Sequence, residues 1–130
     1  LGDGQQDLRY HGGTDRAVVI YSAELIDALQ REGHPIKTGS TVENLTVSGL
    51  GWDLMIPGVV LLAGCARLLL TNYCTPCTKI SASFLSGESS RISQKVRPGW
   101  SRVCARVLAP GTVRTCDIIH LIEHPKPPTE

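Results

Sequence analysis

Two cysteines three residues apart are the residues of this chain whose types and spacing most directly suggest chemistry. Cys74 and Cys77 lie in residues 73–79 (YCTPCTK), with Thr75 and Pro76 between them. This C-x-x-C arrangement occurs in thiol–disulfide oxidoreductases. The same pair could supply half of a metal site, or Cys77 could act alone beside an unrelated neighbour. These three alternatives imply different proteins, so the rest of the chain has to discriminate between them.

The surroundings of the pair favour neither a redox dithiol nor zinc. A redox C-x-x-C begins a helix directly after a strand, so that the helix N-terminus stabilises the thiolate. A strand is expected at residues 66–71, but residues 78–87 (TKISASFLSG) lack the pattern of a long helix. Zinc would need two further ligands, and His120 and His124 lie in a strand-like context that separates them by about 13 Å.

A glycine-rich segment near the beginning forms a second constellation. Successive glycine amides can form an anion-binding nest, but the same segment could be a plain turn with an exposed histidine. Glu43 and Asn44, just before an expected strand, could contact a ligand or merely close a turn. The residues of the first segment are His11, Gly12, Gly13, Thr14 and Asp15.

Three arginines near an expected strand are a third candidate. Arg97, Arg102 and Arg106 could hold a phosphate. Exposed arginines on a strand usually only keep that face of the strand solvated. Residues 100–108 alternate in polarity, which predicts a strand with one wet or ligand-facing side. Arg102, Cys104 and Arg106 lie on that side. Ser101, Val103, Ala105 and Val107 lie on the other.

Composition limits the class of protein. The 130 residues suffice for one domain, and 42% hydrophobic with 19% charged residues is ordinary for a soluble globular protein. The net charge is +1 and the basic residues are scattered, so we expect no nucleic-acid partner. The most apolar run, residues 54–70, is interrupted by proline, glycine and arginine, so we expect no membrane helix.

The cysteine count argues against a secreted disulfide scaffold, which usually has an even number in a shorter chain. This chain has five, and the reducing cytoplasm is therefore the expected compartment. Besides Cys74 and Cys77, the others are expected to be buried, inert thiols in strand-like contexts. They are Cys65, Cys104 and Cys116.

The apolar pattern predicts many short strands and one secure helix, which favours a mostly-β barrel or sandwich. Residues 22–32 should form the helix, because Ser22 can cap it and Gly33 follows its last turn. Residues 2–13 should form a loop, and residues 83–95 one or two short helical turns. Strands are expected at residues 17–21, 45–47, 59–62, 66–71, 100–108 and 118–122.

The order of these segments resembles the MOSC domain, named for the C-terminal part of molybdenum-cofactor sulfurases. The resemblance is carried by GDGQQD, HGGTDRAVVIYS, GSTVENLTVSGL, TNYCTPC and RISQKVRPGWSRVCARVL, from residue 2 to about residue 117. It is closest to the small stand-alone bacterial members. The resemblance implies a β-barrel with one main α-helix and short helical turns, in a single domain at residues 1–124 that lacks its N-terminal strand. Residues 125–130 would be a flexible tail.

The resemblance also implies a function. Such proteins are associated with binding a molybdenum–pterin cofactor, or with carrying sulfur for it, through one cysteine, and relatives reduce N-hydroxylated compounds. By position, that cysteine is Cys77, which would also be the metal ligand, with His11 and Asp15 as the other catalytic residues. By position, the cofactor-binding residues would be Gly12, Gly13, Glu43 and Asn44. Two positive charges are added to them, Lys79 just after Cys77 and Arg102 on the expected strand.

Two positions depart from the family pattern. Many relatives have an arginine where this chain has Asn72, which reduces the positive charge for an anionic cofactor. Small members often have a small residue at Cys74, so the C-x-x-C would be incidental to a functional Cys77. A non-catalytic binding module, a degenerate fragment, and a redox protein using Cys74 and Cys77 remain the alternatives.

The expected partners follow from the same resemblance. They are a small-molecule substrate or cofactor, a redox partner protein, and a second copy of the chain. The last would pair through a sheet edge left open by the missing strand, because an unpaired edge presents free N–H and C=O groups.

Overall fold

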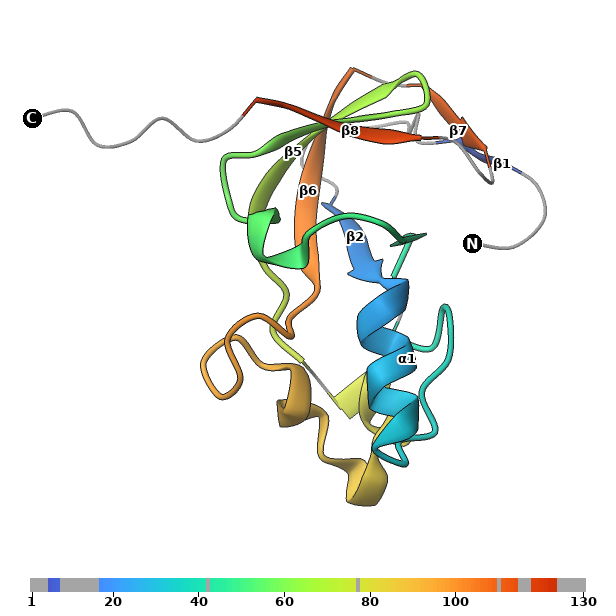
Figure 1. Ribbon diagram of the computed structural model, residues 1–130, viewed down its shortest axis with the longest axis vertical. Coiled ribbons are helices and arrows are strands. Elements are labelled where there is room, and N and C mark those ends of the chain that lie inside the picture. The colour runs from blue at the N-terminus through green and yellow to red at the C-terminus, as the bar shows by residue number, and fades with distance from the viewer. Residues whose placement is uncertain are drawn as a thin grey trace, which may run out of the picture.

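The main element of the fold is a six-stranded sheet, seen at the top of Figure 1. The computed structural model describes residues 5–7, 17–41, 43–76, 78–109, 111–114 and 118–123. The strand order in this sheet is β3-β2-β6-β5-β4-β8. The bounds are β2 Ala17–Ser22, β3 Leu45–Val47, β4 Val60–Ala63, β5 Ala66–Tyr73, β6 Val103–Ala109 and β8 Ile119–Glu123.

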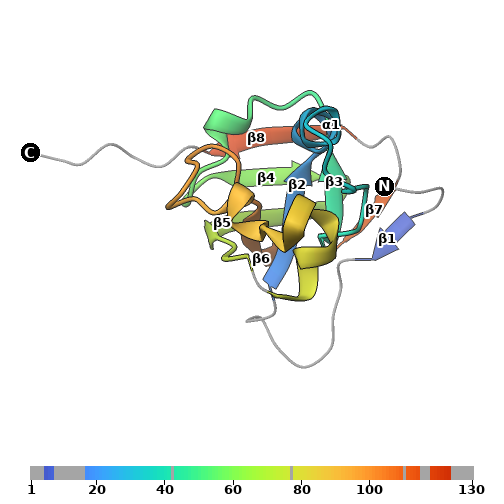
Figure 2. The same ribbon diagram turned by 90° about the horizontal axis from the view of Figure 1, so that it is seen from below.

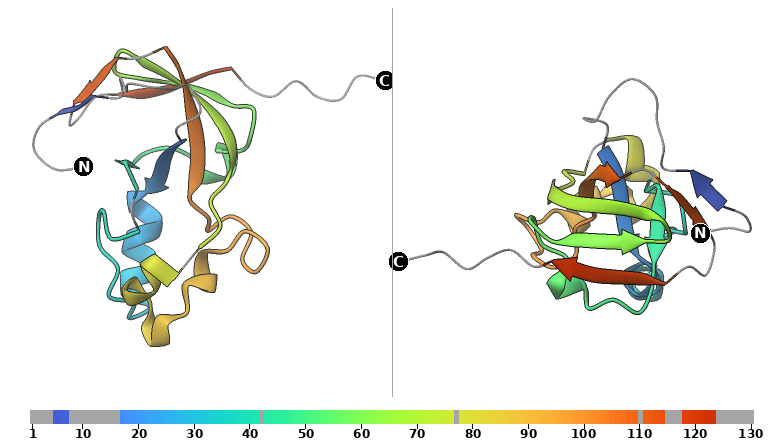
Figure 3. Two further views of the ribbon diagram at one scale, coloured as in Figure 1. Left: turned by 180° about the vertical axis from the view of Figure 1, so that it is seen from behind. Right: turned by 90° about the horizontal axis from the view of Figure 1, so that it is seen from above.

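The sheet is curled into half of a barrel, as Figures 2 and 3 show from below and above. Its neighbouring strands are antiparallel except β2 and β3, which are parallel. A parallel pair needs a crossover connection, and α1 (Ala23–Arg31) lies in that connection. A separate antiparallel pair consists of β1 (Gln5–Asp7) and β7 (Thr112–Arg114). The mostly-β, barrel-like architecture is thus confirmed.

The helix begins and ends where its sequence predicts. The Ser22 side chain accepts a hydrogen bond from the Leu25 amide, which satisfies one free donor of the first turn. Gly33 follows the helix with a φ of +101°, a conformation that glycine adopts without steric cost. Ile26 and Leu29 are buried. Among the described residues α1 is the one α-helix, and its nine residues make about 2.5 turns, slightly fewer than the three that the sequence predicts.

Four short 3₁₀ helices complete the described structure, three of them in the segment that links β5 to β6. They confirm the expected helical turns, although they begin earlier than residue 83. Their bounds are η1 Trp52–Leu54, η2 Thr78–Ser83, η3 Leu85–Gly87 and η4 Ser89–Ile92. In Figure 1 the last three lie beside α1, below the sheet.

Two groups of buried side chains form the interior. The sheet core consists of aliphatic side chains and lies under the curled sheet; the helix core lies between α1 and the 3₁₀ turns. The members of the sheet core are Val18, Ile20, Leu45, Val47, Met55, Val59, Leu61, Ala63, Ala66, Leu68, Leu70, Val103, Ala105, Val107 and Val113. The members of the helix core are Tyr21, Ile26, Leu29, Ile36, Ile80, Phe84 and Ile92.

The structure corrects two expectations about the chain. Residues 5–7, expected within a loop, form β1, because they find a pairing partner in β7 far along the sequence. Cys65, expected to be buried in a strand, is exposed in the turn between β4 and β5. That turn is tightly covered, since a Cβ added to Gly111 would lie 2.5 Å from the Cys65 carbonyl carbon.

No described helix is long and apolar enough to cross a membrane. Residues 125–130, expected to form a flexible tail, lie outside the described residues.

Candidate functional site

The residues that flank Cys77 form the described part of the candidate site. Cys77 itself lies outside the described residues, as do His11, Gly12, Gly13 and Asp15. The segment before Cys77 is held to residues 101 and 102 by hydrogen bonds of Cys74. The Cys74 amide donates a hydrogen bond of 3.0 Å to the Arg102 carbonyl oxygen, which continues the pairing of β5 with β6 beyond the end of the strand. The Ser101 hydroxyl lies 3.3 Å from the Cys74 carbonyl oxygen.

Arg102 provides a buried positive charge beside this segment. Its side chain was expected on a wet strand face, but the residue precedes β6 and is only 5% exposed. Its guanidinium donates to the carbonyl oxygens of Thr41 (2.7 Å) and Thr75 (3.3 Å). The second bond places the guanidinium against the chain two residues before Cys77. By contrast, Arg106 is exposed, so these arginines do not form a joint phosphate site.

Glu43 is joined to Arg102 through Thr41. The Thr41 hydroxyl donates to one Glu43 oxygen (2.6 Å), while Gly39 N and the Thr46 hydroxyl donate to the other (2.7 and 2.8 Å). Partial burial tends to raise the pKa of Glu43, but these hydrogen bonds outweigh it and hold the pKa below its ordinary value. Glu43 is therefore a carboxylate whose two oxygens accept hydrogen bonds from the loop before β3 and from Thr46 in β3.

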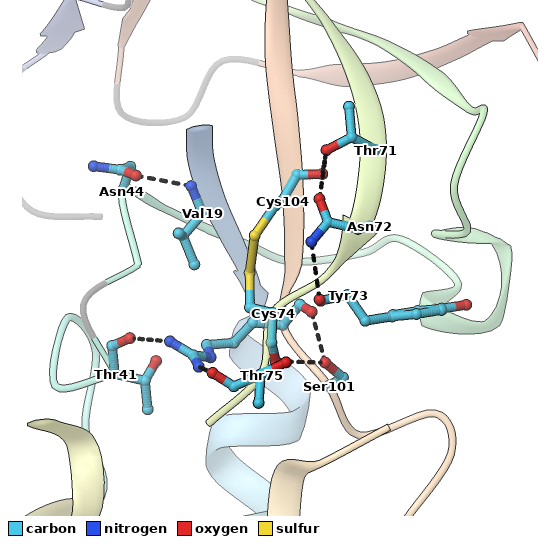
Figure 4. The surroundings of a disulfide bond; sticks show 11 residues. Val19, Thr41, Asn44, Thr71, Asn72, Tyr73, Cys74, Thr75, Ser101 and Cys104 are labelled. Atoms are coloured by element: carbon cyan, nitrogen blue, oxygen red, sulfur yellow. Dashed lines mark hydrogen bonds between the residues drawn. A yellow bond between two sulfur atoms is a disulfide. The ribbon is translucent and has the colours of Figure 1, made fainter. Parts of the chain in front are cut away.

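Asn44, the neighbour of Glu43, belongs to the sheet. Its Oδ1 accepts from the Val19 amide (2.8 Å), and its own amide donates to the Val19 carbonyl oxygen (2.7 Å). Figure 4 shows this side chain directed at β2, away from Thr75 and Cys74. The expected Glu43–Asn44 pair is thus divided: one residue contacts the Arg102 network, and the other extends the pairing of β2 and β3.

Tyr21 lies in the same electrostatic environment. Its hydroxyl donates a short hydrogen bond of 2.6 Å to the Trp100 carbonyl oxygen, two residues before Arg102. Burial raises the pKa of the Tyr21 hydroxyl well above its ordinary range, and the charges of Arg102 and Arg91 only partly oppose this effect. Tyr21 therefore remains a neutral hydrogen-bond donor that fixes the segment before β6.

Cys74 is bonded to Cys104, and this overturns the expectation that Cys104 is an inert thiol. The disulfide joins the residue after β5 to the second residue of β6, with 5.9 Å between the Cα atoms. Figure 4 shows it crossing between the two strands beside Thr75 and Ser101. In this state Cys74 is thus not a partner of Cys77 in a C-x-x-C dithiol. Cys104 is not an inert thiol.

A cavity opens next to Cys74. It has a volume of about 270 Å³, and its polar side chains include Lys95 and Gln94. Its remaining lining residues are Tyr73, Cys74, Thr75 and Ser93. A second cavity of about 290 Å³ shares Tyr73 and Gln94 and is lined otherwise mainly by residues 52–56 and 98–101. Both cavities lie at the end of β5, where Tyr73 lines each of them.

Sequence reasoning placed two cofactor-binding candidates, Glu43 and Arg102, in what proves to be one network. It missed Thr41, which connects them, and also Thr75 and Tyr21, which bond to Arg102 and to the segment before it, because threonine hydroxyls, carbonyls and a buried tyrosine give no motif. Lys79 lies in η2, and its side chain is not described. Cys116 and His124 lie outside the described residues, among which no group of metal-ligating side chains gathers.

Comparisons with known proteins agree with the architecture. The family model of the MOSC domain matches residues 7–120. The chain is 33% identical over 113 residues to the protein YflK of Bacillus subtilis (strain 168), a match that covers 86% of this chain and 50% of YflK.

Two solved structures are similar as well. The crystal structure of YiiM from Geobacillus stearothermophilus has a TM-score of 0.71 at 26% identity, covering 92% of this chain and 60% of that one. YiiM from Escherichia coli has a TM-score of 0.69 at 24% identity, covering 95% of this chain and 64% of that one, a likeness of fold alone. This chain therefore spans about half the length of YflK and less than two thirds of either YiiM chain.

Proposed function

This chain belongs to the MOSC domain family, and on that premise we propose that it binds a molybdenum–pterin cofactor, or carries sulfur for it, through Cys77. The reaction we propose for the bound form is the reduction of N-hydroxylated compounds. The observation that carries the proposal is the buried Arg102 guanidinium, hydrogen-bonded to the Thr75 carbonyl oxygen two residues before Cys77.

The chemistry of the flanking residues fits such a group. A thiolate is a soft ligand, of the kind that binds thiophilic metals and carries sulfur. A pterin cofactor is anionic, and the cavity beside Cys74 offers the Lys95 ammonium and the Gln94 amide. When bound, the molybdenum would supply two-electron redox chemistry.

The residues of the chain have separate tasks in this proposal. The charge of Arg102 favours the thiolate form of Cys77, because a nearby guanidinium lowers a thiol's pKa from about 8.5. Thr41 holds the guanidinium on its other side, and Glu43 holds Thr41. Asn44 keeps β3 against β2, so it acts on the position of this loop.

The decisive experiment measures molybdenum and persulfide sulfur in protein purified from cells that make the cofactor abundantly. We expect near-stoichiometric loading in the unaltered protein and its loss in Cys77→Ser. Cys65→Ser is the matched control, since Cys65 is exposed in a turn of the sheet, and it should load normally. Equal loading of both variants would contradict the assignment of Cys77. Absence of both elements from the unaltered protein would favour a non-catalytic binding module.

A second experiment tests Arg102 as a positioning residue. The alkylation rate of Cys77 as a function of pH gives the thiol pKa. We expect Arg102→Gln to raise that pKa by about one unit or more. Arg106→Gln, which changes an exposed arginine on β6, should leave it unchanged. Circular dichroism would verify that both variants fold, and equal pKa values in both would exclude the role.

The remaining parts of the proposal concern the cell. We place the protein in the cytoplasm, with a small-molecule substrate and a redox partner protein that supplies electrons. A second copy would pair through a sheet end. Within the described residues those ends are β3 and β8. Light scattering of the purified chain tests this dimer directly.

A further inference from the structure

The disulfide between Cys74 and Cys104 depends on an irregularity in β5. Leu70 pairs with Ala105, but Asn72 pairs with Cys104, so Thr71 is an extra residue without a partner of its own. Such a β-bulge reverses the alternation of side chains beyond it. Tyr73, partly buried, then packs against the sheet core. Cys74 follows on the face that carries Cys104.

The two cysteines are therefore diagonal neighbours on one face of an antiparallel pair. Diagonal neighbours are ordinarily about 7–8 Å apart. The 5.9 Å between these Cα atoms lies within the range that a disulfide requires. The bond joins strands already held by backbone hydrogen bonds, so it is not needed to bring them together.

The surroundings of Cys74 suit exchange with a small thiol. Cys74 is 8% exposed and lines the 270 Å³ cavity. Lys95 lines it too, and its ammonium would attract a thiol that carries carboxylates and would stabilise the attacking thiolate. In a reducing compartment, disulfides that do form are usually transient and catalytic or redox-sensing.

We propose that Cys74–Cys104 is a thiol-exchange site for a small anionic thiol, and that its redox state sets the reactivity of Cys77. The attacking thiolate forms a bond to the Cys74 sulfur. The Cys74–Cys104 bond breaks, and its electron pair leaves on the Cys104 sulfur, which then takes a proton. A second thiol releases Cys74 and departs with the first as their disulfide. The protein gains two electrons, and two thiols are oxidised.

Reduction would act on Cys77 through the short segment between them. Cys74 is held by its covalent bond to Cys104 and by the hydrogen bonds to residues 101 and 102. Once the covalent bond is broken, the contacts of 3.0 Å and 3.3 Å at Cys74 and of 3.3 Å at Thr75 remain. Cys74 and Thr75 are then held by these hydrogen bonds alone, so the segment that leads to Cys77 is less constrained.

The test uses the full chain, free of molybdenum, equilibrated in mixtures of reduced and oxidised glutathione and quenched with acid. Differential alkylation and mass spectrometry then give the oxidised fraction of each cysteine. Trypsin places Cys104 in residues 103–106 and both Cys74 and Cys77 in residues 68–79, where fragmentation separates them. We expect Cys74 and Cys104 to be oxidised together as the share of oxidised glutathione rises.

Two results would overturn the exchange itself: Cys104 reduced in every mixture, or Cys104 still oxidised in reduced glutathione alone. In Cys104→Ser, glutathione should remain attached to Cys74, and Lys95→Gln should slow that attachment about threefold. Cys65, which is exposed, serves as the internal reference for the attachment rate. If Lys95→Gln left the rate of glutathione attachment to Cys74 unchanged, the proposed preference for an anionic thiol would be wrong.

The effect on Cys77 is measured by its alkylation rate in the fully oxidised and fully reduced protein. We expect about a tenfold difference. The double variant Cys74→Ser/Cys104→Ser should have the reduced protein's rate in every mixture. Equal rates in both states would refute control of Cys77. Since no molybdenum is present, this outcome is independent of the cofactor assignment.

Discussion

The sheet core and the helix core are stabilised in different ways. The sheet core consists of aliphatic side chains, most of them from strands whose residues alternate between the two faces of one curved sheet. The helix core includes the hydroxyl of Tyr21 and is enclosed by polar contacts. Arg91 is one of these: it forms a bidentate pair with Glu32 (2.6 and 2.9 Å) and lies 4.0 Å from the Trp100 ring centroid.

The difference shows where a sequence pattern is sufficient to define structure. A surface that alternates every second residue is specified by many interchangeable apolar side chains. A polar contact such as the Ser83–Ser40 hydroxyl pair (2.8 Å) is specified by two particular residues. We therefore expect substitutions in the sheet core to cause the larger losses of stability. Substitutions in the polar region, meaning the hydrogen bonds and ion pairs around the helix core, should mainly alter the candidate site.

The largest expected effect is that of Leu68→Ala in the sheet core. Leu68 is fully buried, so its truncation leaves a cavity and should lower the free energy of unfolding by about 2–5 kcal/mol. Leu69→Ala, which changes the partly exposed next residue, is the control and should cost less than half as much. Urea unfolding measures both. Equal losses would show that the two faces of β5 do not differ as described.

Gly111→Ala should be the next most damaging. A Cβ at this position would overlap the Cys65 backbone, which cannot move away without opening the β4–β5 turn. We expect a loss of about 1–3 kcal/mol. Gly51→Ala is the control, since its Cβ would meet side chains and no backbone: the end of Asp53 at 3.1 Å and Leu54 at 3.5 Å. Urea unfolding measures both variants. If Gly111→Ala left the free energy of unfolding unchanged, the β4–β5 turn would have to move away from residue 111 without cost.

In the polar region, Tyr21→Phe should cost about 1–2 kcal/mol, because it leaves the Trp100 carbonyl oxygen without its donor. The ring and its edge contact with Trp52 remain. Tyr73→Phe, whose hydroxyl makes no hydrogen bond among the described residues, should be nearly neutral. Thermal unfolding of the two variants distinguishes them, and equal midpoints would contradict a structural role for the Tyr21 hydroxyl.

The smallest expected effect depends on pH and concerns Glu43. Its pKa is depressed in the folded protein, so the stability it contributes is present above its ordinary value of 4.5 and is lost as the pH falls through the lower folded value. Glu43→Gln should therefore be less stable than the unaltered protein at neutral pH. The difference should narrow below pH 4.5 in urea titrations. A constant difference at every pH would show that the charge of Glu43 does not matter.

Most of the fold was predictable, because β2, α1, β3, β4 and β5 follow from apolar periodicity and helix capping, which are local patterns of the sequence. The pairing of β1 with β7 was not, because residues 5–7 have no apolar pattern. Among the residues predicted for the site, Glu43 and Arg102 were singled out from the sequence, but their connection through Thr41 was not predictable. The burial of Arg102 and the bond between Cys74 and Cys104 depend on contacts between distant segments, which no local pattern contains.

The extra residue in β5 has a consequence for the comparison of related chains. Since side chains along a strand alternate with a period of two, one inserted residue acts as a change of phase. A relative that keeps both cysteines but lacks a counterpart of Thr71 would direct the first cysteine into the sheet core, away from the second. Strand length, rather than the presence of cysteines, therefore indicates which members of the family can form this bond.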